Sequence, residues 1–496
     1  MSIIDIKNLE FTYIGDIKPI FENINLQLDS NWKLGLIGRN GYGKSTFLNI
    51  LLGKLDYSGT ITSKVHFEYF PYKIKNEDYL TVDVVEEIKG NYELWKLERE
   101  LNLLKVDLDI LYRPFNTLSG GEQTKVLIAS MFISDNNFLL IDEPTNSLDI
   151  NGRRILAEYL NKKSGFILVS HDRNFLNHTI DHVLTIEKQK IVLQKGNYDT
   201  WKENKEAEDE FNRNKNEKLK KEIDRLEKSS REKANWSDKV EASKNMRNSG
   251  SKVDKGYVGH KSAKMMQRSK NLEQRYKKTL EEKTGLLTNI EFEDDLVLES
   301  VPHHSKNLIV AENYSISFNN RKIFEPLDFS IENGEIVTIT GENGAGKSSF
   351  LKSIVGFNIK RNGSLKLASN LKISYLPQEF DWIKGSLDDF IENNSVDKTK
   401  FLTLLRKMGF DRDTFDKDIG SYSSGQKKKV LISKSICEEA NIYIWDEPLN
   451  YLDIITRLQI ERMILKYKPT IILVEHDEDF LKNINARNIE IKKIRD

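Results

Sequence analysis

The sequence predicts an α/β protein in which two similar halves are joined by a long antiparallel helical hairpin. Five motifs occur twice in the same order, which indicates an internal repeat. In both halves, short apolar runs alternate with amphipathic stretches, a pattern typical of a mostly parallel sheet covered by helices. The segment between the halves has no proline and is dense in charge. We therefore expect domains at 1–201 and 291–496, and a helical linker at 202–290 whose tip lies at about 241–259.

Each half contains a glycine-rich loop between a strand and a helix. The loops read GRNGYGKS at Gly38–Ser45 and GENGAGKS at Gly341–Ser348. Apolar strands are expected before them, at Trp32–Ile37 and Glu335–Thr340. Glycines in such a loop let backbone N–H groups surround phosphate oxygens, and the helix N-terminus adds positive charge. Both loops therefore predict nucleotide binding.

Side chains of the loops are expected to divide this work. Lys44 and Lys347 would reach the β and γ phosphates of ATP, while Ser45 and Ser348 would bind Mg²⁺ through their hydroxyls. The predicted ATP ligands of the loops are Gly38, Asn40, Gly41, Gly43, Lys44, Ser45 and Thr46 in the first half, and Gly341, Asn343, Gly344, Gly346, Lys347, Ser348 and Ser349 in the second.

A second motif places two adjacent carboxylates at the end of an apolar strand. It reads FLLIDEPTNSLD in the first half and IYIWDEPLNYLD in the second. Asp142 and Asp446 are predicted Mg²⁺ ligands, and Glu143 and Glu447 are predicted to orient and deprotonate the attacking water. The competing interpretation is that the two glutamates only cap the turn before the prolines that follow them.

Each half also has a histidine after a further apolar strand, in ILVSHDRNFL and ILVEHDEDFL. His171 and His476 are predicted to sense the γ-phosphate or to hold the attacking water. The alternative for a single histidine of this kind is a packed core residue, but the repeat favours the functional interpretation.

Charge is unevenly distributed along the chain. Lys plus Arg and Asp plus Glu both total 76, yet Lys228 to Lys278 contains fifteen basic residues and five acidic ones, an excess of ten positive charges. This excess indicates an arm suited to RNA phosphates, although a solvated hairpin that only spaces two domains is the alternative. No apolar run approaches the ~18 residues that a membrane helix needs. One cysteine, Cys437, favours a reducing compartment, so we expect a cytoplasmic protein.

The order of the motifs resembles that of the ABC ATPases: Walker A loop, glutamine loop, signature, Walker B strand and switch histidine. The signature reads LSGGEQ from Leu118 and YSSGQK from Tyr422, and a glutamine loop, ISYLPQ, ends at Gln378. Two such cassettes with a charged helical linker resemble the ABC-F proteins. The phrases NWKLGLIGRNG, YIWDEPLNYLD and RPFNTLSGGE resemble the Lsa-type antibiotic-resistance subgroup. The resemblance implies two tandem ABC-type P-loop ATPase domains joined by the hairpin linker.

The resemblance also implies that the cassettes close head to tail, with each ATP between the Walker A loop of one half and the signature of the other. Site 1 would combine Lys44, Ser45, Asp142, Glu143 and His171 with Ser423, Ser424, Gly425 and Gln426. Site 2 would combine Lys347, Ser348, Gln378, Asp446, Glu447 and His476 with Ser119, Gly120, Gly121 and Glu122. Tyr13 and Phe318 match the aromatic residues that stack on adenine, and the implied Mg²⁺ ligands are Ser45, Asp142, Ser348, Gln378 and Asp446.

Two departures from the family pattern fall on site 1. Tyr72 stands where the second half has Gln378, and Ser424 stands where glycine is usual. We therefore expect site 1 to bind ATP but to hydrolyse it more slowly than site 2. Site 2 has departures of its own, Leu449 and Glu475, in place of Thr145 and Ser170.

For this subgroup the resemblance implies an ATPase that binds the tRNA exit site of the 70S ribosome. Its linker would contact 23S rRNA and P-site tRNA and dislodge lincosamides, streptogramin A compounds and pleuromutilins from the peptidyl-transferase centre. We expect a monomer with Mg²⁺ and ATP at two sites and no membrane or DNA partner. The alternatives are a housekeeping ABC-F translation factor that relieves stalled ribosomes and, more remotely, the cytosolic ATPase subunit of an ABC exporter. The predicted ribosome contacts are Lys244, Met246, Arg247, Lys252, Val253, Lys255, Tyr257, Lys261, Lys264 and Arg268.

Overall fold

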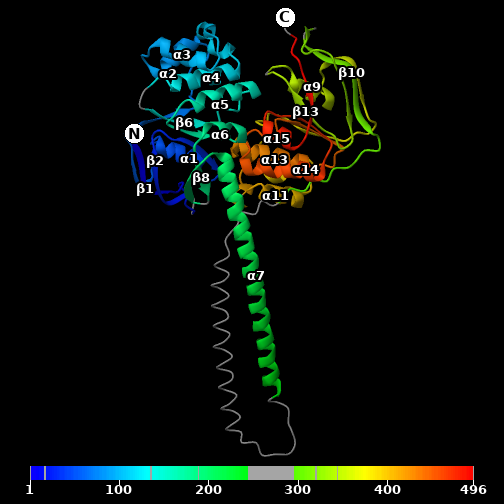
Figure 1. Cartoon of the computed structure of the whole chain (residues 1–496). Helices are drawn as coiled ribbons and strands as arrows, with labels where there is room; N and C mark the ends of the chain where they lie inside the picture. Colours follow the sequence, from blue (N-terminus) through cyan, green and yellow to red (C-terminus); the bar gives the residue numbers. More distant parts are fainter. Residues whose placement is uncertain are drawn as a thin grey trace, which may run out of the picture. The chain divides into compact units, whose positions relative to one another are not determined.

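The computed structural model describes residues 2–15, 18–134, 137–187, 189–243, 295–318, 321–342, 344–410 and 412–494. Met1–Trp201 and Glu293–Asp496 form one compact unit, and Lys202–Phe292 form another. Figure 1 shows the elements in chain order. The first unit contains two cassettes of the same construction, each with a mostly parallel sheet, an antiparallel sheet and covering helices, which confirms the predicted fold class.

The main sheet of the first cassette has the strand order β5-β6-β7-β3-β8-β9. Neighbouring strands run parallel except β8 and β9. Central strands such as β7 are buried throughout, because helices cover both faces of a parallel sheet. The strands are β3 (Lys33–Gly38), β5 (His66–Phe70), β6 (Asn137–Asp142), β7 (Phe166–Val169), β8 (His182–Glu187) and β9 (Lys190–Lys195). The helices are α1 (Lys44–Leu51), α2 (Thr81–Lys89), α3 (Leu94–Leu103), α4 (Gly120–Met131), α5 (Ile150–Asn161) and α6 (Arg173–Thr179).

The second cassette repeats this order as β15-β16-β17-β13-β18. Its strands are β13 (Ile336–Thr340), β15 (Ile373–Leu376), β16 (Ile442–Asp446), β17 (Ile471–Val474) and β18 (Arg487–Glu490). Its helices are α9 (Lys347–Val355), α10 (Leu387–Asn393), α11 (Lys398–Lys407), α12 (Arg412–Phe415), α13 (Ser424–Cys437), α14 (Ile454–Tyr467) and α15 (Glu478–Asn483).

Each cassette also has an antiparallel sheet. In the first cassette its order is β2-β1-β4, and in the second β10 pairs with β11, β12 and β14. The strands are β1 (Ile3–Phe11), β2 (Phe21–Asp29), β4 (Ser58–Thr62), β10 (Asn307–Phe318), β11 (Arg321–Lys322), β12 (Leu327–Glu332) and β14 (Lys360–Leu367). Phe318 is therefore the last residue of β10, and Tyr13 lies two residues after the end of β1.

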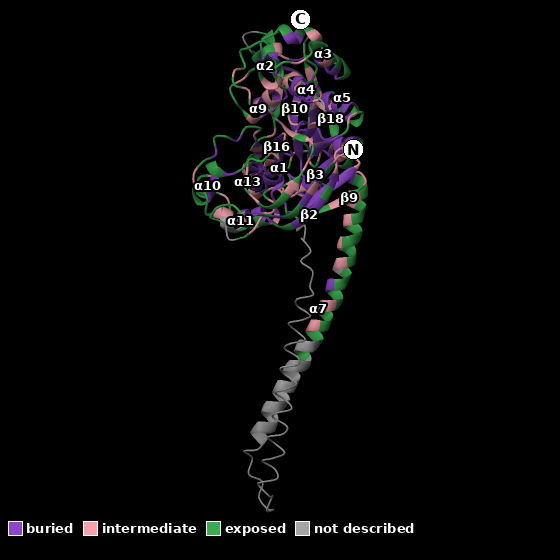
Figure 2. Cartoon of the chain, turned by 90° about the vertical axis from the view of Figure 1, so that its left-hand side faces the viewer, coloured by how far each residue is buried: buried purple, intermediate pink, exposed green. Residues whose placement is uncertain are grey.

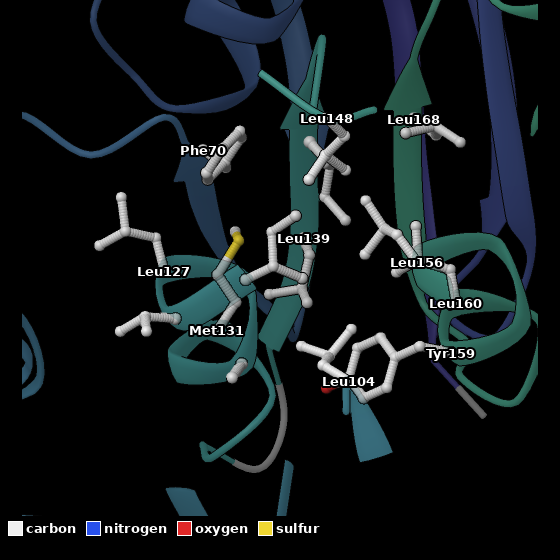
Figure 3. Packing of buried hydrophobic residues seen from close by; sticks show 14 of the residues in the cluster. Phe70, Leu104, Leu127, Met131, Leu139, Leu148, Leu156, Tyr159, Leu160 and Leu168 are labelled. Atoms are coloured by element: carbon white, nitrogen blue, oxygen red, sulfur yellow. The ribbon is translucent and has the colours of Figure 1, made fainter. Parts of the chain in front are cut away.

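A shared core joins the signature helix of the first cassette to the strand that carries its paired carboxylates. In Figure 3, Met131 of α4 lies beside Leu139 of β6, and Leu127 of α4 belongs to the same buried cluster. Leu156 of α5 belongs to the same buried cluster. The side chains of α4, α5 and β6 therefore share one close-packed core.

The linker begins as α7 (Tyr198–Ser243), which spans 46 residues and is therefore about 69 Å long. This confirms the first helix of the predicted hairpin. Figure 2 shows that the residues of α7 whose burial is described are mostly exposed or half-buried, in contrast to the buried interior of the cassettes, drawn in purple. The return helix, most of the tip and all the predicted ribosome contacts lie outside the described residues. Within the part of the chain that the structure describes, no helix is both long and apolar enough to cross a membrane.

Candidate active sites

The Walker A loops depend on a glycine directly before each helix. Gly43 before α1 has φ 98° and Gly346 before α9 has φ 91°, a region that side chains disfavour. A Cβ on Gly43 would lie 2.6 Å from Ile20, and one on Gly346 would lie 2.8 Å from Ile323. Any larger residue would therefore force the loops away from the sheet.

The loop lysines fold back over the loops. The Lys44 ammonium donates to the carbonyl of Gly38 at 2.7 Å and to the side chain of Asn40 at 3.2 Å. The Lys347 ammonium donates to the carbonyl of Gly341 at 2.8 Å. Burial lowers the pKa of both lysines, and neighbouring carboxylates oppose this shift. Each loop thus holds a buried cation over converging backbone groups, which is an arrangement suited to phosphate.

A cavity of about 1080 Å³ lies over the first Walker A loop and is lined by both cassettes. The predicted site 1 residues on its wall are Tyr13, Asn40, Gly41, Gly43, Lys44, Ser45, Thr46, Asp142, Glu143, His171, Ser423, Ser424, Gly425 and Gln426. The cavity also reaches Gly120, which the sequence assigned to site 2, because the start of α4 adjoins Ser147 after the Asp-Glu pair.

Direct contacts join the two cassettes at site 1. The side chain of Asn40 donates to the carbonyl of Tyr451 at 2.9 Å, and its backbone N–H donates to Asp453 Oδ2 at 3.3 Å. A Cβ on Gly425 would lie 2.4 Å from Asn40 Nδ2. The first Walker A loop therefore faces the second signature, as head-to-tail closure requires.

At site 2 the structure records a longer-range link between the cassettes. Asp149 of the first cassette lies close enough to Lys347 to raise the pKa of that lysine, against the lowering by burial. Ser119, Gly121 and Glu122 stand at the start of α4, where Ser119 and Glu122 form a capping box. Their meeting with Lys347 stays a prediction. Asn343 lies outside the described residues.

The glutamates after the Walker B strands have a strained backbone. Glu143 has φ 51° and Glu447 has φ 49°, values that are uncommon for residues other than glycine. Burial, and next the charge of Asp142, raise the pKa of Glu143 to about 8. Burial and Asp446 also raise the pKa of Glu447. A high pKa suits a carboxylate that accepts a proton from water.

A histidine stands beside each of these glutamates. His171 Nε2 lies 3.3 Å from Glu143 Oε1, and His476 Nε2 lies 4.0 Å from Glu447 Oε1. Burial, then the charge of Lys347, lower the pKa of His476 to about 3, and burial likewise lowers the pKa of His171. Both rings are therefore neutral at pH 7.

The second cassette has the donor set that Mg²⁺ requires. Both carboxylate oxygens of Asp446 are buried and without a hydrogen-bond partner, which suits a metal ligand. Ser348 Oγ lies 3.3 Å from Gln378 Oε1, and Gln378 Nε2 donates to Glu447 Oε2 at 2.9 Å. Oxygen atoms of Ser348, Gln378 and Asp446, the predicted Mg²⁺ ligands, thus lie beside the predicted base.

The first cassette differs at the same place. Tyr72, the counterpart of Gln378, directs its hydroxyl to Glu68, which also binds Lys89, and it does not line the cavity. Instead, Tyr69 donates its hydroxyl to Asp142 Oδ2 at 3.0 Å. The sequence analysis did not single out Tyr69. The equivalent residue of the second half, Tyr375 in ISYLPQ, is also a tyrosine, and this repetition was a usable signal.

The predicted adenine-stacking residues are accessible but not alike in their contacts. Tyr13 is 42% exposed and its hydroxyl lies 2.8 Å from Thr46 Oγ1, at the wall of the cavity. Phe318 is 46% exposed at the end of β10. Their role toward adenine stays a prediction.

The family model described as "ABC transporter" matches this chain twice, at residues 21–146 and 324–450. Ribosome protection protein VmlR of Bacillus subtilis (strain 168) is 28% identical over 475 residues, which cover 95% of this chain and 84% of that protein. ATP-binding protein Uup of Buchnera aphidicola (subsp. Acyrthosiphon pisum, strain APS) is 29% identical, over 97% of this chain and 79% of that protein. Probable ATP-binding protein YbiT of Escherichia coli O157:H7 is 28% identical, over 96% of this chain and 93% of that protein.

Among solved structures, the chain is similar in fold to a crystallised complex of archaeal ribosomal stalk protein aP1 and ribosome recycling factor aABCE1. The TM-score is 0.60 at 20% identity, covering 97% of this chain and 87% of that one. RNase-L Inhibitor has a TM-score of 0.60 at 19% identity, covering 99% of this chain and 91% of that one.

Proposed function

Because the chain belongs to the ABC transporter family of ATP-binding proteins and its relatives are ABC-F ATPases, we propose that it is an ATP-driven ribosomal protection protein. The observation that carries this proposal is the similarity of nearly the whole chain to a ribosome protection protein. The protein binds the tRNA exit site of the 70S ribosome as a cytoplasmic monomer. There it dislodges lincosamides, streptogramin A compounds or pleuromutilins without modifying them.

Hydrolysis takes place at the two composite sites. Lys44 and Lys347 hold the phosphates. At site 2 the oxygens of Ser348, Gln378 and Asp446 would hold Mg²⁺, which would supply positive charge to the reacting phosphate. At site 2, Glu447 takes a proton from the attacking water, and the neutral ring of His476 holds that water in line. The hydrogen bond from Gln378 to Glu447 keeps the base beside the metal ligands before ATP arrives.

Site 1 is the slower of the two. Its Tyr72 is turned toward Glu68, so the cavity lacks the amide that Gln378 supplies at site 2. Tyr69 also occupies one oxygen of Asp142, the predicted Mg²⁺ ligand. Both features support ATP binding with slow turnover, in agreement with the departures in the sequence.

The linker is the part that acts on the ribosome. Its excess of ten positive charges between Lys228 and Lys278 favours contact with 23S rRNA and P-site tRNA. The predicted ribosome contacts, from Lys244 to Arg268, lie in the tip at about 241–259 and in the segment that follows it.

A housekeeping ABC-F translation factor is the second candidate, since the relatives named only as ATP-binding proteins are as similar to this chain as the ribosome protection protein is. Deletion of the gene separates the two. Drug sensitivity with normal growth otherwise supports protection, whereas slow growth without drug supports the housekeeping role.

Cryo-electron microscopy of the Glu143→Gln, Glu447→Gln double variant with ATP and ribosomes tests the proposal directly. We expect the trapped protein in the tRNA exit site with its linker tip at the peptidyl-transferase centre. A double variant that binds ATP but does not bind ribosomes would contradict the proposal. Co-sedimentation with membranes instead of ribosomes would favour an exporter subunit.

A further inference from the structure

The signature helix of the second cassette carries a buried lysine that has no equivalent in the first. Ser423 caps α13 and forms a capping box with Gln426 at the wall of site 1. Lys428 follows two residues later and is 1% exposed. The corresponding residue of α4, five positions after Ser119, is Thr124.

The Lys428 ammonium binds the backbone of site 2. It donates to the carbonyl of Pro377 at 3.2 Å and to the carbonyl of Asp446 at 3.2 Å. Gln378 directly follows the first of these carbonyls and Glu447 follows the second. One side chain on the helix that serves site 1 therefore holds together the ends of β15 and β16, which carry the ligands and base of site 2.

Charge explains why a lysine is tolerated at this depth. A buried ammonium is costly unless opposite charges and hydrogen bonds compensate it. Burial lowers the pKa of Lys428 to about 8, and the charges of Asp446, Glu475 and Glu447 oppose this shift. Glu475 is itself specific to the second cassette, where it replaces Ser170. The lysine and the added carboxylate are thus complementary departures.

We infer that Lys428 is a positioning residue that couples the signature at site 1 to the catalytic geometry of site 2. This inference rests on the proposed assignment of the two ATP sites. Closure of α13 on ATP at site 1 is transmitted through Lys428 to the carbonyls beside Gln378 and Glu447. Thr124 has no ammonium, so α4 in the first cassette lacks the connection that Lys428 makes from its helix to the two carbonyls. The coupling through this lysine therefore runs from site 1 to site 2.

A double-mutant cycle in the full chain tests the coupling. In a Glu143→Gln background, only site 2 hydrolyses ATP. Gly425→Ala then disturbs site 1, because a Cβ there would lie 2.5 Å from the carbonyl of Tyr451. We expect Gly425→Ala to lower site 2 turnover by about tenfold, and by less than about twofold once Lys428→Met is present.

Lys428→Met alone is expected to lower kcat by about tenfold with KM for ATP changed by less than about twofold. Lys428→Gln keeps an N–H donor and should recover most of this loss, which a purely structural defect would not show. Lys434→Met is the matched control on the same helix, because Lys434 pairs with Glu438 four residues on and is 21% exposed.

Two results would overturn the inference. The first is that Gly425→Ala and Lys428→Met lower site 2 turnover independently, so that their effects multiply. The second is a loss of kcat in Lys428→Met that Lys428→Gln does not relieve. Absence of ATPase activity in the wild-type chain would instead contradict the proposed function.

Discussion

The two cassettes share one scaffold but surround their switch histidines with different groups. In the first, Thr145 and Ser170 form a neutral hydroxyl pair at 3.3 Å. In the second, Glu475 accepts the backbone N–H of Leu449 at 2.7 Å and that of His476 at 2.9 Å. A carboxylate with two oxygens thus replaces two separate hydroxyls. The comparison shows that a duplicated fold can keep its motifs in place while the local charge changes.

Substituting one catalytic glutamate at a time should give the largest difference in ATP turnover between the two cassettes. Glu447→Gln is expected to lower ATP turnover by about a hundredfold, because it removes the proton acceptor of the faster site. Glu143→Gln should lower total turnover by about twofold or less. Steady-state phosphate release measures both, with ATP binding as the control. Equal losses would remove the proposed difference between the sites.

Among the residues that the structure describes, a buried ion pair joins the cassettes at one of two equivalent positions. Arg173 Nη2 lies 2.7 Å from Glu461 Oε2, and the counterparts of these residues are Glu478 and Ala157, which cannot form a pair. Arg173→Met should destabilise the protein by about 3–5 kcal/mol, because it leaves a buried carboxylate unpaired. The change is measured as a lower thermal midpoint.

The exposed pair between Arg154 and Glu478, at 3.3 Å, is the control for that experiment. Its side chains are 65% and 42% exposed, so Arg154→Met should cost less than about 1 kcal/mol. Similar losses for the two variants would show that burial does not distinguish these pairs.

In acid the two cassettes should behave alike. The folded protein lowers the pKa of His476 to about 3, so between that pH and the unfolded pKa of about 6.5 the unfolded chain binds the extra proton. Stability from this group is complete above pH 6.5 and decreases as the pH falls. At pH 5 the loss is about 2 kcal/mol.

His476→Gln should therefore reduce the drop in thermal midpoint between pH 7.5 and pH 5, and His171→Gln should act in the same direction. The exposed His178 provides the control substitution. An acid sensitivity unchanged by His476→Gln would contradict the buried neutral ring.

Tyr69 and Tyr375 occupy equivalent positions in the two cassettes, and substituting them should give the smallest difference. Tyr69 donates to Asp142, whereas the buried hydroxyl of Tyr375 lacks a hydrogen-bond partner. Tyr69→Phe should cost about 1 kcal/mol, while Tyr375→Phe should be neutral or slightly stabilising. Thermal midpoints of the two variants measure this, and a larger loss for Tyr375→Phe would reverse the comparison.

Sequence patterns predicted the scaffold well, because buried parallel strands are continuous apolar runs. The strands expected at Trp32–Ile37 and Glu335–Thr340 are β3 (Lys33–Gly38) and β13 (Ile336–Thr340) in the structure. The repeated glycine loops also predicted the positions of α1 and α9. Local signals of this kind depend on neighbours within a few residues.

Contacts between distant segments could not be predicted in the same way. Lys428 resembled any other lysine of a basic signature helix, and only the fold brings it beneath Pro377 and Asp446. Arg173 and Glu461 are 288 residues apart. No periodicity connects such residues, so their pairing depends on how the two cassettes pack.

The left-handed backbone at Glu143 and Glu447 has a consequence for the evolution of the protein. A glycine at either position relieves a conformational strain of about 1 kcal/mol or more while it removes the base. Selection for heat resistance alone would therefore favour inactive variants at these two positions. Each of these positions is therefore a site of trade-off between stability and activity.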